Sequence, residues 1–425
     1  MAAGESAAIR TRLLRRHLAH AARSPFYGEL FSQAGLDPRK LRTIEDLAQL
    51  PCTTKRDLEG RGRDFLAVPA GDIVDICESS GTTGLPVALL QTRADLERLA
   101  YNEESSFRAA GITPGERVLV AAALDRCFMA GLAYFLGLTR LGALAIRGGS
   151  GSVAFLAELV LRHRPAALVG VPTLLAAVAE AVTARGAEPA AIGVKRLVCI
   201  GEPVRREDLA LSALGERLTA LWHADVQGTY ASTEMATSFC DCTSGMGGHL
   251  LPDLMVVEIL DDEGRPVRAG EPGEVVATPL QVNGMPLVRF RTGDIATLHT
   301  AQCSCGRTSP RLGPVVGRKS QMLKIKGTTV YPPAIFAALQ EIPGMQGYYV
   351  EVRDTFELSD RITVTVGASA GALTPEAVAD RIAVRTRVKP EVVIATPEEI
   401  VARTIRADKR KPITFFDLRE KRHVH

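Results

Sequence analysis

The segment from Glu78 to Pro86 reads Glu-Ser-Ser-Gly-Thr-Thr-Gly-Leu-Pro and carries the strongest chemical signal in the sequence. Small hydroxyl residues and glycines present backbone N–H groups and hydroxyl donors to phosphate oxygens, with no bulky side chain in the way. The segment lacks the Gly-Lys-Ser/Thr of a Walker loop and the GxGxxG of a dinucleotide loop. Taken alone, its composition also suits a flexible linker. We interpret it as a phosphate-binding loop whose binding residues are Ser79, Ser80, Gly81, Thr82, Thr83 and Gly84.

The second group of chemically capable residues consists of two Cys-x-Cys pairs, at positions 240 and 242 and at positions 303 and 305, together with His249. Thiolates and imidazole are ligands that zinc prefers in a tetrahedral site. Because the two pairs flank a strand-rich stretch, they can converge on one structural zinc. The alternative is a set of reduced, partly buried thiols. Eight cysteines in 425 residues are too sparse for a disulfide framework, which predicts a reducing, cytoplasmic setting.

Length and composition limit the number of domains and the class of protein that can position these residues. The 425 residues predict two or three domains at roughly 150 residues each. A hydrophobic share of 46% and a net charge of +3 exclude a disordered chain and a strongly basic nucleic-acid binder. The sequence has no run of about 18 uninterrupted apolar residues, so we expect no membrane span. The sequence is compatible with both a monomer and a homodimer.

The pattern of apolar and polar residues changes three times along the chain. Residues 8–115 have a helical pattern with loops, and in residues 117–230 short apolar runs alternate with helical stretches, which predicts a parallel sheet. Residues 253–300 have the pattern of hairpin strands. Beyond Gly317 the pattern predicts a helix that begins at Pro332-Pro333 and ends near 340, strands near 348–353 and 361–367, and a helix at 374–387. We therefore predict an α/β fold: a large domain at 1–316 with parallel sheets and a distorted β-rich part, and a small, mobile α+β domain at 317–425.

Several motifs accompany the phosphate loop in a fixed order. They are Ser24 to Tyr27 with Leu50 to Leu58, Gly201-Glu202-Pro203, Tyr230-Ala231-Ser232-Thr233-Glu234, Arg289 to Asp294, Gly317-Arg318, and the tail from Lys411 to Arg419. In content and order these motifs resemble the adenylate-forming enzymes, and within that superfamily the phenylacetate-CoA ligase-like branch. The resemblance covers nearly the whole chain, and it implies a large N-terminal domain that binds ATP and an acid, followed by a mobile C-terminal lid.

The resemblance implies a site for ATP and Mg²⁺. Phosphoryl chemistry needs a divalent ion and a carboxylate to hold it, so we expect Glu234 to bind Mg²⁺ and Thr233 to contact the α-phosphate. Asp294 follows a glycine in a tight turn and is expected to bind the ribose hydroxyls, with Arg318 as a second ribose contact. The further nucleotide contacts that the resemblance implies are Gly201, Glu202, Pro203, Tyr230, Ala231 and Ser232.

The tail is expected to supply a catalytic lysine. A cation neutralises the negative charge that gathers between a carboxylate and the α-phosphate when an acyl adenylate forms. Alignment of the tail with the family assigns this role to Lys411, with Lys409 as the alternative. The tail departs from the family at Arg410 and at Thr414-Phe415, and the hinge departs at Ser320, where an acidic residue is usual.

Two further sets of residues follow from the resemblance. Some members of the branch carry a cysteine, a histidine seven residues later and a Cys-x-Cys-Gly-Arg motif. These match Cys242, His249, Cys303 and Cys305 as zinc ligands, with Cys240 as an alternative to Cys242.

The acid-binding pocket is expected at a glycine-rich segment with aromatic residues on both sides. Its residues are Phe128, Ala130, Gly131 and Tyr134. Space beside the small residues suits a flat aryl acid, although aromatic residues in such a segment are also common in a protein core.

The predicted activity is ATP-dependent conversion of a small, aromatic carboxylic acid to acyl-AMP, followed by thioesterification with coenzyme A. Two alternatives remain at this point. One is an amide synthetase or pathway-specific adenylating enzyme that passes the acyl group to an acceptor other than CoA. The other is a non-catalytic nucleotide-binding or acyl-binding protein of the same fold.

Overall fold

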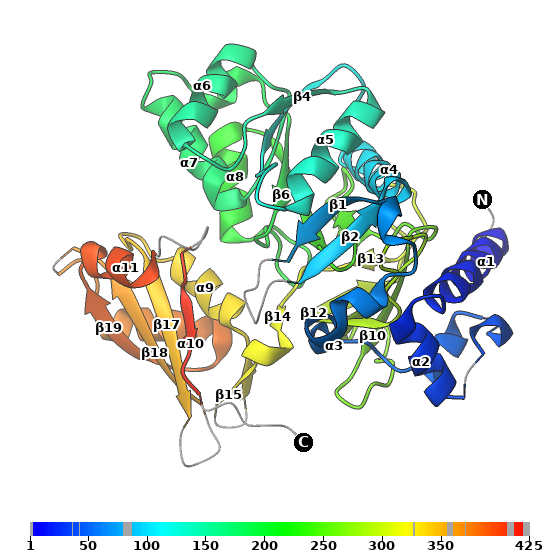
Figure 1. Cartoon of the computed structure of the whole chain (residues 1–425). Coiled ribbons are helices and arrows are strands. Elements are labelled where there is room, and N and C mark those ends of the chain that lie inside the picture. Colours follow the sequence, from blue (N-terminus) through cyan, green and yellow to red (C-terminus); the bar gives the residue numbers. More distant parts are fainter. Residues whose placement is uncertain are drawn as a thin grey trace. The chain divides into compact units, whose positions relative to one another are not determined.

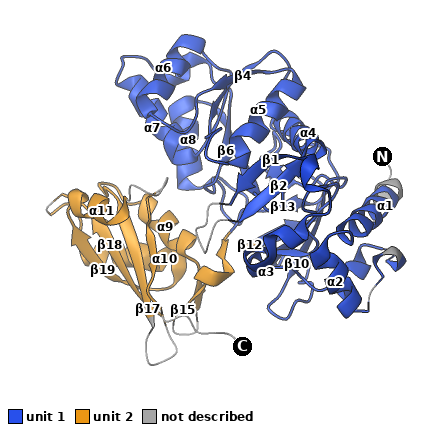
Figure 2. Ribbon diagram, viewed as in Figure 1, with its two compact units in different colours: residues 1–292, 296–315 blue, residues 293–295, 316–425 orange. Residues whose placement is uncertain are grey.

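The computed structural model describes residues 3–35, 37–41, 43–79, 87–325, 328–354, 360–369, 371–405 and 412–419. The chain forms two compact units (Figure 2). The first consists of Met1–Thr292 and Ala296–Val315, and the second of Gly293–Ile295 and Val316–His425. The assignment of ATP and acid binding to one domain and of a mobile lid to the other stays a prediction.

A six-stranded sheet in the first unit confirms the parallel sheet predicted from the alternating pattern. Its strands are β3 (Arg117–Ala121), β4 (Leu144–Arg147), β5 (Ala167–Gly170), β6 (Arg196–Ile200), β7 (Asp225–Ser232) and β8 (Thr237–Cys240). They lie in the order β4-β3-β5-β6-β7-β8, and every pair is parallel except β7 with β8. The carboxyl ends of five strands therefore meet at one edge, where ligands of such sheets bind.

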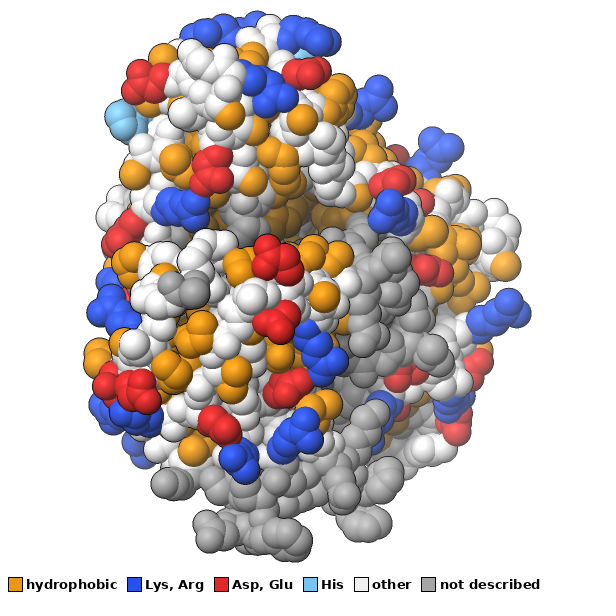
Figure 3. Space-filling model, turned by 90° about the vertical axis from the view of Figure 1, so that its left-hand side faces the viewer, with side chains coloured by type: hydrophobic (Ala, Val, Ile, Leu, Met, Phe, Trp, Pro, Cys, Tyr) orange, Lys and Arg blue, Asp and Glu red, His pale blue; other side chains and the backbone are white. Residues whose placement is uncertain are grey.

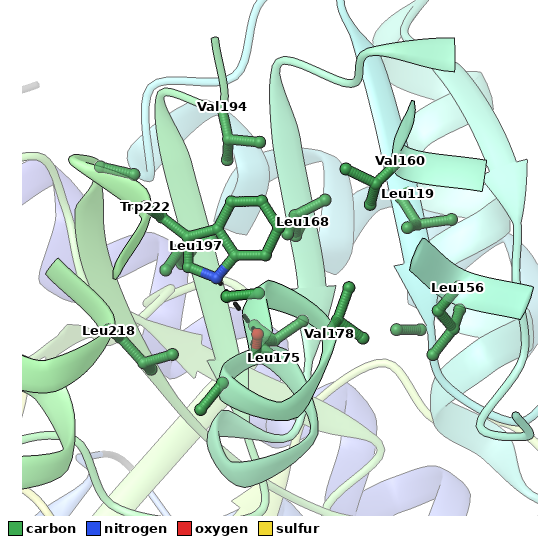
Figure 4. Close-up of a cluster of buried hydrophobic side chains, with 14 of the residues drawn as sticks. Leu119, Leu156, Val160, Leu168, Leu175, Val178, Val194, Leu197, Leu218 and Trp222 are labelled. Atoms are coloured by element: carbon green, nitrogen blue, oxygen red, sulfur yellow. Dashed lines mark hydrogen bonds between the residues drawn. The ribbon is translucent and has the colours of Figure 1, made fainter. Parts of the chain in front are cut away.

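Helices cover both faces of this sheet (Figure 1). Along β3 the side chains alternate: Val118 and Val120 pack against α4 (Arg93–Ala109) and α5 (Met129–Leu141), whereas Leu119 and Ala121 face the other way. The helices on that second face are α6 (Val153–His163), α7 (Pro172–Thr183) and α8 (Ala213–Trp222). Trp222 is fully buried there and donates its Nε1–H to the carbonyl of Leu175 at 3.1 Å (Figure 4).

The N-terminal part contains helices, as predicted, and also a hairpin that the pattern did not indicate. The helices are α1 (Ala3–Ala21), α2 (Pro25–Gln33) and α3 (Lys55–Arg61). The hairpin pairs β1 (Ile73–Glu78) with β2 (Ala88–Thr92). In β1 the buried residue is Cys77, while Val74 and Ile76 are 53% and 50% exposed. The apolar residues therefore do not mark the buried face of this strand, which is why the pattern failed here.

The predicted hairpin strands between residues 253 and 300 are confirmed. A second sheet has the order β10-β11-β12-β13-β9. Its strands are β9 (Gly248–His249), β10 (Met255–Leu260), β11 (Pro272–Pro279), β12 (Phe290–His299) and β13 (Arg311–Leu312). After β10 the chain turns at Asp261, whose carboxylate accepts the Arg265 backbone N–H at 2.8 Å, and Gly264 takes a φ of 79° that favours glycine.

The second unit is an α+β body built on a sheet in the order β19-β18-β17-β20. Its elements are β14 (Gly317–Arg318), β15 (Leu323–Ile325), β16 (Thr328–Val330), α9 (Pro332–Gln340), β17 (Tyr348–Asp354), β18 (Asp360–Gly367), α10 (Pro375–Thr386), β19 (Glu391–Ala395), α11 (Pro397–Thr404) and β20 (Phe415–Asp417). The strands and helices predicted at 332–340, 348–353, 361–367 and 374–387 are confirmed. The short elements β19, α11 and β20 were not predicted.

The distribution of charges on the surface and the lengths and polarity of the helices match what the composition predicts. On the face drawn in Figure 3, acidic and basic side chains are interspersed among apolar ones, as the net charge of +3 leads us to expect. Within the described residues, each helix is either too short or too polar to cross a lipid bilayer.

Candidate active site

The base of the predicted phosphate loop lies where the chain passes from β1 to β2, next to the Glu78–Ala88 pair of the hairpin. Ser79 is 6% exposed; its backbone N–H donates to the Val87 carbonyl, and its Oγ accepts the Val87 N–H, each at 3.0 Å. The preceding Glu78 N–H donates to the carbonyl of Cys127 at 2.8 Å. These bonds fix both ends of the loop. Its predicted binding residues Ser80, Gly81, Thr82, Thr83 and Gly84 lie outside the described residues.

The residues predicted to bind Mg²⁺ and the α-phosphate lie in the tight turn that joins β7 to β8. Thr233 and Glu234 are half-buried. The turn is held by the Ala236 N–H, which donates to the Thr233 carbonyl, and by the Met235 N–H, which donates to Ser232 Oγ, both at 3.2 Å. Before the turn, Ala231 is exposed and the ring of Tyr230 stacks on Phe239, with centroids 6.0 Å apart.

The loop predicted for the adenine side follows β6, beside this turn. Ile200 pairs with Thr229, so Gly201 and Tyr230 continue from neighbouring parallel strands at their carboxyl ends. Gly201 has a φ of 73°, and Pro203 is exposed. The carboxylate of Glu202 accepts the hydroxyl of Thr173 at 3.0 Å and the Thr173 N–H at 3.1 Å, at the start of α7. Glu202 therefore ties the loop to a helix N-terminus, where a negative charge is stabilised.

Arg98 is a residue of this region that sequence reasoning missed. It lies on α4, is 6% exposed, and donates to the carbonyls of Leu280 and Leu254 at 2.6 and 2.7 Å. It also donates to the Ala236 carbonyl and, at 2.9 Å, to the hydroxyl of Thr237. One guanidinium thus fixes the chain directly after the Thr233–Glu234 turn. Burial lowers the pKa of Arg98 to about 10, so it stays protonated at neutral pH.

The signal for Arg98 is a row of polar residues at helical spacing. Asp95, Arg98, Asn102 and Ser106 are all buried on α4, three or four residues apart. From sequence alone such a row indicates the solvent face of an amphipathic helix, because polar side chains usually face water. Only the tertiary structure shows that this face is turned inward.

The two residues predicted to bind the ribose, Asp294 and Arg318, are brought together within the second unit. They are register partners across β12 and β14, and Arg318 Nε donates to Asp294 Oδ1 at 3.1 Å. The side chain of Asp294 is 8% exposed and that of Arg318 42%. The preceding Gly293 has a φ of 74°, a conformation that glycine adopts without strain.

The four residues predicted to line the acid pocket lie at the start of α5. Phe128 and Ala130 are half-buried. Tyr134 is 3% exposed and packs edge-on against Phe107 in the core, and burial raises the pKa of its hydroxyl. At Gly131 a side chain would begin 2.0 Å from the Ala123 carbonyl oxygen, so the helix approaches the segment that follows β3 closely only because this residue is glycine. A larger residue at Gly131 would disturb packing before it filled a pocket.

The predicted metal ligands form one compact cluster. The ligand atoms of Cys242, His249, Cys303 and Cys305 all lie within 4.8 Å of one another. Cys242 Sγ is 3.7 Å from Cys303 Sγ, and Cys305 Sγ is 3.4 Å from His249 Nε2. The other ring nitrogen, Nδ1, is 3.0 Å from the hydroxyl of Ser309, which fixes the ring with Nε2 toward the thiols. Three sulfurs and one imidazole at these separations fit a tetrahedral zinc site.

The alternative ligand Cys240 lies elsewhere, at the end of β8. It is 3% exposed and packs in the core that contains Phe107 and Tyr134. The structure therefore groups Cys242, and not Cys240, with the other three predicted ligands.

The end of the tail is anchored within the second unit. β20 pairs in parallel with β17, and Arg419 forms ion pairs with Asp417 at 2.6 Å and with Asp360 at 3.2 Å. The same guanidinium donates to the carbonyl of Ser320, the residue that departs from the family at the hinge. The candidate lysines Lys409 and Lys411 lie outside the described residues.

Comparisons with known proteins show which family and fold the chain resembles. The family described as AMP-binding enzyme matches residues 29–282. The phenylacetate-coenzyme A ligase of Thermus thermophilus is 32% identical over 80% of this chain and 77% of its own length. The phenylacetate-coenzyme A ligase of Escherichia coli is 30% identical over 98% of this chain and 95% of its own. A crystal structure of 2-hydroxyisobutyryl-CoA ligase in the postadenylation state has a TM-score of 0.85 and 26% identity, and covers 98% of this chain and 90% of its own.

The chain belongs to the adenylate-forming, AMP-binding enzymes, in their phenylacetate-CoA ligase-like branch. It is an AMP-forming acid–CoA ligase that activates a carboxylic acid with ATP and transfers the acyl group to coenzyme A. The fold class and this activity were both predicted from the sequence and are confirmed. The two alternatives, an amide synthetase or other CoA-independent adenylating enzyme and a non-catalytic binding protein, are not favoured.

Proposed function

We propose that the acid is a small aryl acid, of the size of benzoate or phenylacetate, and that Mg²⁺ serves the adenylation step. The observation that carries the proposal is the carboxyl edge of β6 and β7, where Gly201 and Tyr230 continue from paired strands and the Thr233–Glu234 turn follows. Two relatives that cover most of the chain are phenylacetate-coenzyme A ligases, which supports the aryl class.

In the adenylation step, the half-buried Glu234 provides the carboxylate for Mg²⁺, and Thr233 donates its hydroxyl to the α-phosphate. A bound Mg²⁺ supplies neutralisation of charge on the phosphate oxygens. Asp294 accepts hydrogen bonds from the ribose hydroxyls, and Arg318, which already contacts Asp294, holds that carboxylate in place. Lys411 stabilises the charge that develops between the acid and the α-phosphate.

The cysteine and histidine cluster has a separate role in this proposal. Four protein ligands close a zinc site and leave no position for substrate, which is the pattern of a structural metal. The cluster joins the segment after β8, the strand β9 and the loop between β12 and β13. Zinc at Cys242, His249, Cys303 and Cys305 would therefore hold together three segments that have little other regular structure.

Substrate-dependent pyrophosphate release tests the proposal. The purified chain is supplied with ATP and Mg²⁺ and with benzoate, phenylacetate, 2-hydroxyisobutyrate or dodecanoate, with and without CoA. We expect an aryl acid to give the highest kcat/KM, pyrophosphate release to require Mg²⁺, and CoA to be converted to the thioester. A preference for 2-hydroxyisobutyrate or dodecanoate would contradict the aryl class, and adenylation that proceeds unchanged after removal of divalent ions would contradict the role of Mg²⁺.

A further inference from the structure

A cavity of about 660 Å³ lies in the first unit, away from the residues proposed for catalysis. It is bounded by α1, by α4, by the end of α5 and by the turn after β11. The residues Ser79, Thr233 and Glu234 do not line it. Cavities of this size bind molecules as large as nucleotides.

The side chains that line this cavity include more basic than acidic groups. Four arginines, Arg16, Arg23, Arg98 and Arg140, face one acidic residue, Glu97. Arg16 lies on α1 and Arg23 in the turn that directly follows this helix, and both line the cavity. Both are exposed, and neither has an ion-pair partner within the described part of the chain. Their charges are therefore available to an anion.

The other two arginines, Arg98 and Arg140, contribute to the positive charge of the lining in different ways. The guanidinium of Arg140 lies 5.8 Å from the ring centroid of Tyr101 and is paired with Glu104. Arg98 is buried, and its hydrogen bonds go to three carbonyls and one hydroxyl. Among the described residues, no carboxylate forms a hydrogen bond with Arg98, while Asp95 and Asp253 act on its charge at longer range, so Arg98 adds a partly offset positive charge to the floor of the cavity.

An unpartnered buried atom supports a ligand independently of these charges. His17 lines the cavity and is 3% exposed, and its Nε2 is 2.9 Å from the Leu287 carbonyl. Nε2 must carry the hydrogen in that bond, which leaves Nδ1 as an acceptor. Nδ1 is buried and has no hydrogen-bond partner among the described residues. A buried acceptor without a donor is costly, and a hydroxyl group of a ligand would satisfy it.

We infer that this cavity binds an organic phosphate, with the phosphate group at Arg16 and Arg23 and a hydroxyl-bearing part directed toward His17. Guanidinium groups match phosphate oxygens in pairs of hydrogen bonds, which favours phosphate over a simple halide. Leu13, Leu254 and Val282 add apolar surface for the rest of the molecule. The site is distinct from the one where ATP reacts, and Arg98 connects the two because it also donates to the Ala236 carbonyl.

Calorimetric titration tests this inference. The full chain is titrated with glucose 6-phosphate and, separately, with inorganic phosphate, neither of which carries the adenosine part that the catalytic site binds. We expect one site per chain for glucose 6-phosphate and weaker binding of inorganic phosphate. In the double variant Arg16→Ser/Arg23→Ser we expect the affinity for glucose 6-phosphate to fall by at least about tenfold, because charge-assisted hydrogen bonds are lost.

The matched control is Arg12→Ser, an exposed arginine of α1 that does not line the cavity. It should bind glucose 6-phosphate as the unmodified chain does. Circular dichroism of all variants establishes that helix content is retained. The inference is overturned if no saturable binding occurs, if the double variant binds as tightly as the unmodified chain, if Arg12→Ser loses as much affinity, or if inorganic phosphate binds as tightly as glucose 6-phosphate.

Discussion

Arg318 Nε lies 3.1 Å from Oδ1 of Asp294, and the backbones of the same two residues are register partners across β12 and β14. The two proposed ribose contacts are thus held both through their side chains and through their strands. The carboxylate is nearly buried, at 8% exposure, and the arginine is 42% exposed. Arg318 therefore orients a carboxylate that has little freedom of its own.

We expect Asp294→Asn to lower kcat/KM for ATP by about 10²-fold, because the substitution removes a charged acceptor for two hydroxyls. Steady-state pyrophosphate release at varied ATP measures the effect, and the KM for the acid should change little. Asp380→Asn, an exposed carboxylate of α10 that pairs with Lys389, is the control and should behave as the unmodified enzyme. An unchanged KM and kcat for ATP in Asp294→Asn would exclude a ribose contact at this position.

The tail lysine can be identified by separating the two half-reactions. Lys411→Ala should reduce acid-dependent adenylation by about 10²-fold or more, because it removes the cation that stabilises developing charge. Thioesterification from supplied acyl-AMP should remain largely intact. Lys409→Ala is the matched control two residues away. If Lys409→Ala shows the loss and Lys411→Ala does not, the alignment of the tail is displaced by two residues.

We expect about one tightly held zinc per chain in protein prepared without chelators, because four protein ligands complete a tetrahedral site. Cys303→Ser should lower the zinc content and the midpoint of thermal unfolding, while the kcat of the remaining folded enzyme stays near its usual value. Cys240→Ser removes the cysteine that lies outside the cluster and should keep the metal. Elemental analysis measures the stoichiometry, and protein without zinc would contradict the site.

Glu103 makes stability depend on pH. Burial raises the pKa of its carboxyl from 4.5 to about 7, and the hydrogen bond donated by Ser238 Oγ at 2.7 Å opposes part of the rise. Between these two values the folded chain holds a proton that the unfolded chain has lost. The free energy of unfolding therefore falls as the pH rises from about 4.5 to 7 and stays lowered above that range.

Glu103→Gln removes this ionisation. At pH 8 we expect the variant to be more stable than the unmodified enzyme by up to about 3 kcal/mol, and we expect the difference to vanish toward pH 4. Urea unfolding at several pH values measures it. Glu97→Gln, at an exposed position of the same helix, should keep the usual pH profile. A constant difference between Glu103→Gln and the unmodified enzyme at all pH values would show that packing, and not ionisation, causes it.

The sequence predicted those parts of the structure whose signals are local. Apolar runs separated by helical stretches identified the parallel sheet, and Pro332-Pro333 marked the start of α9. The β1–β2 hairpin was not predicted, because Val74 and Ile76 lie on its exposed face. Its stability depends on pairing between β1 and β2, which single-strand periodicity does not report.

The arrangement of side chains in the site was predictable only where motifs name the residues. The cluster of Cys242, His249, Cys303 and Cys305 follows from spacing and from resemblance. The contact between Glu202 and Thr173 does not, since 29 residues separate the two. Arg98 was missed for the same reason, because its partners are backbone carbonyls far along the chain. Every residue has a backbone carbonyl, so the sequence does not show which ones accept hydrogen bonds from Arg98.

The single tryptophan of the chain is Trp222, which is fully buried between α8 and α7 with its indole N–H bonded to the Leu175 carbonyl. Intrinsic tryptophan emission therefore reports the packing of one region, the core between the parallel sheet of the first unit and the helices that contain Trp222 and Leu175. Melting of the second unit leaves this emission unchanged, whereas far-ultraviolet circular dichroism records both. The difference between the two signals gives the order in which the two units unfold, with no label attached to the protein.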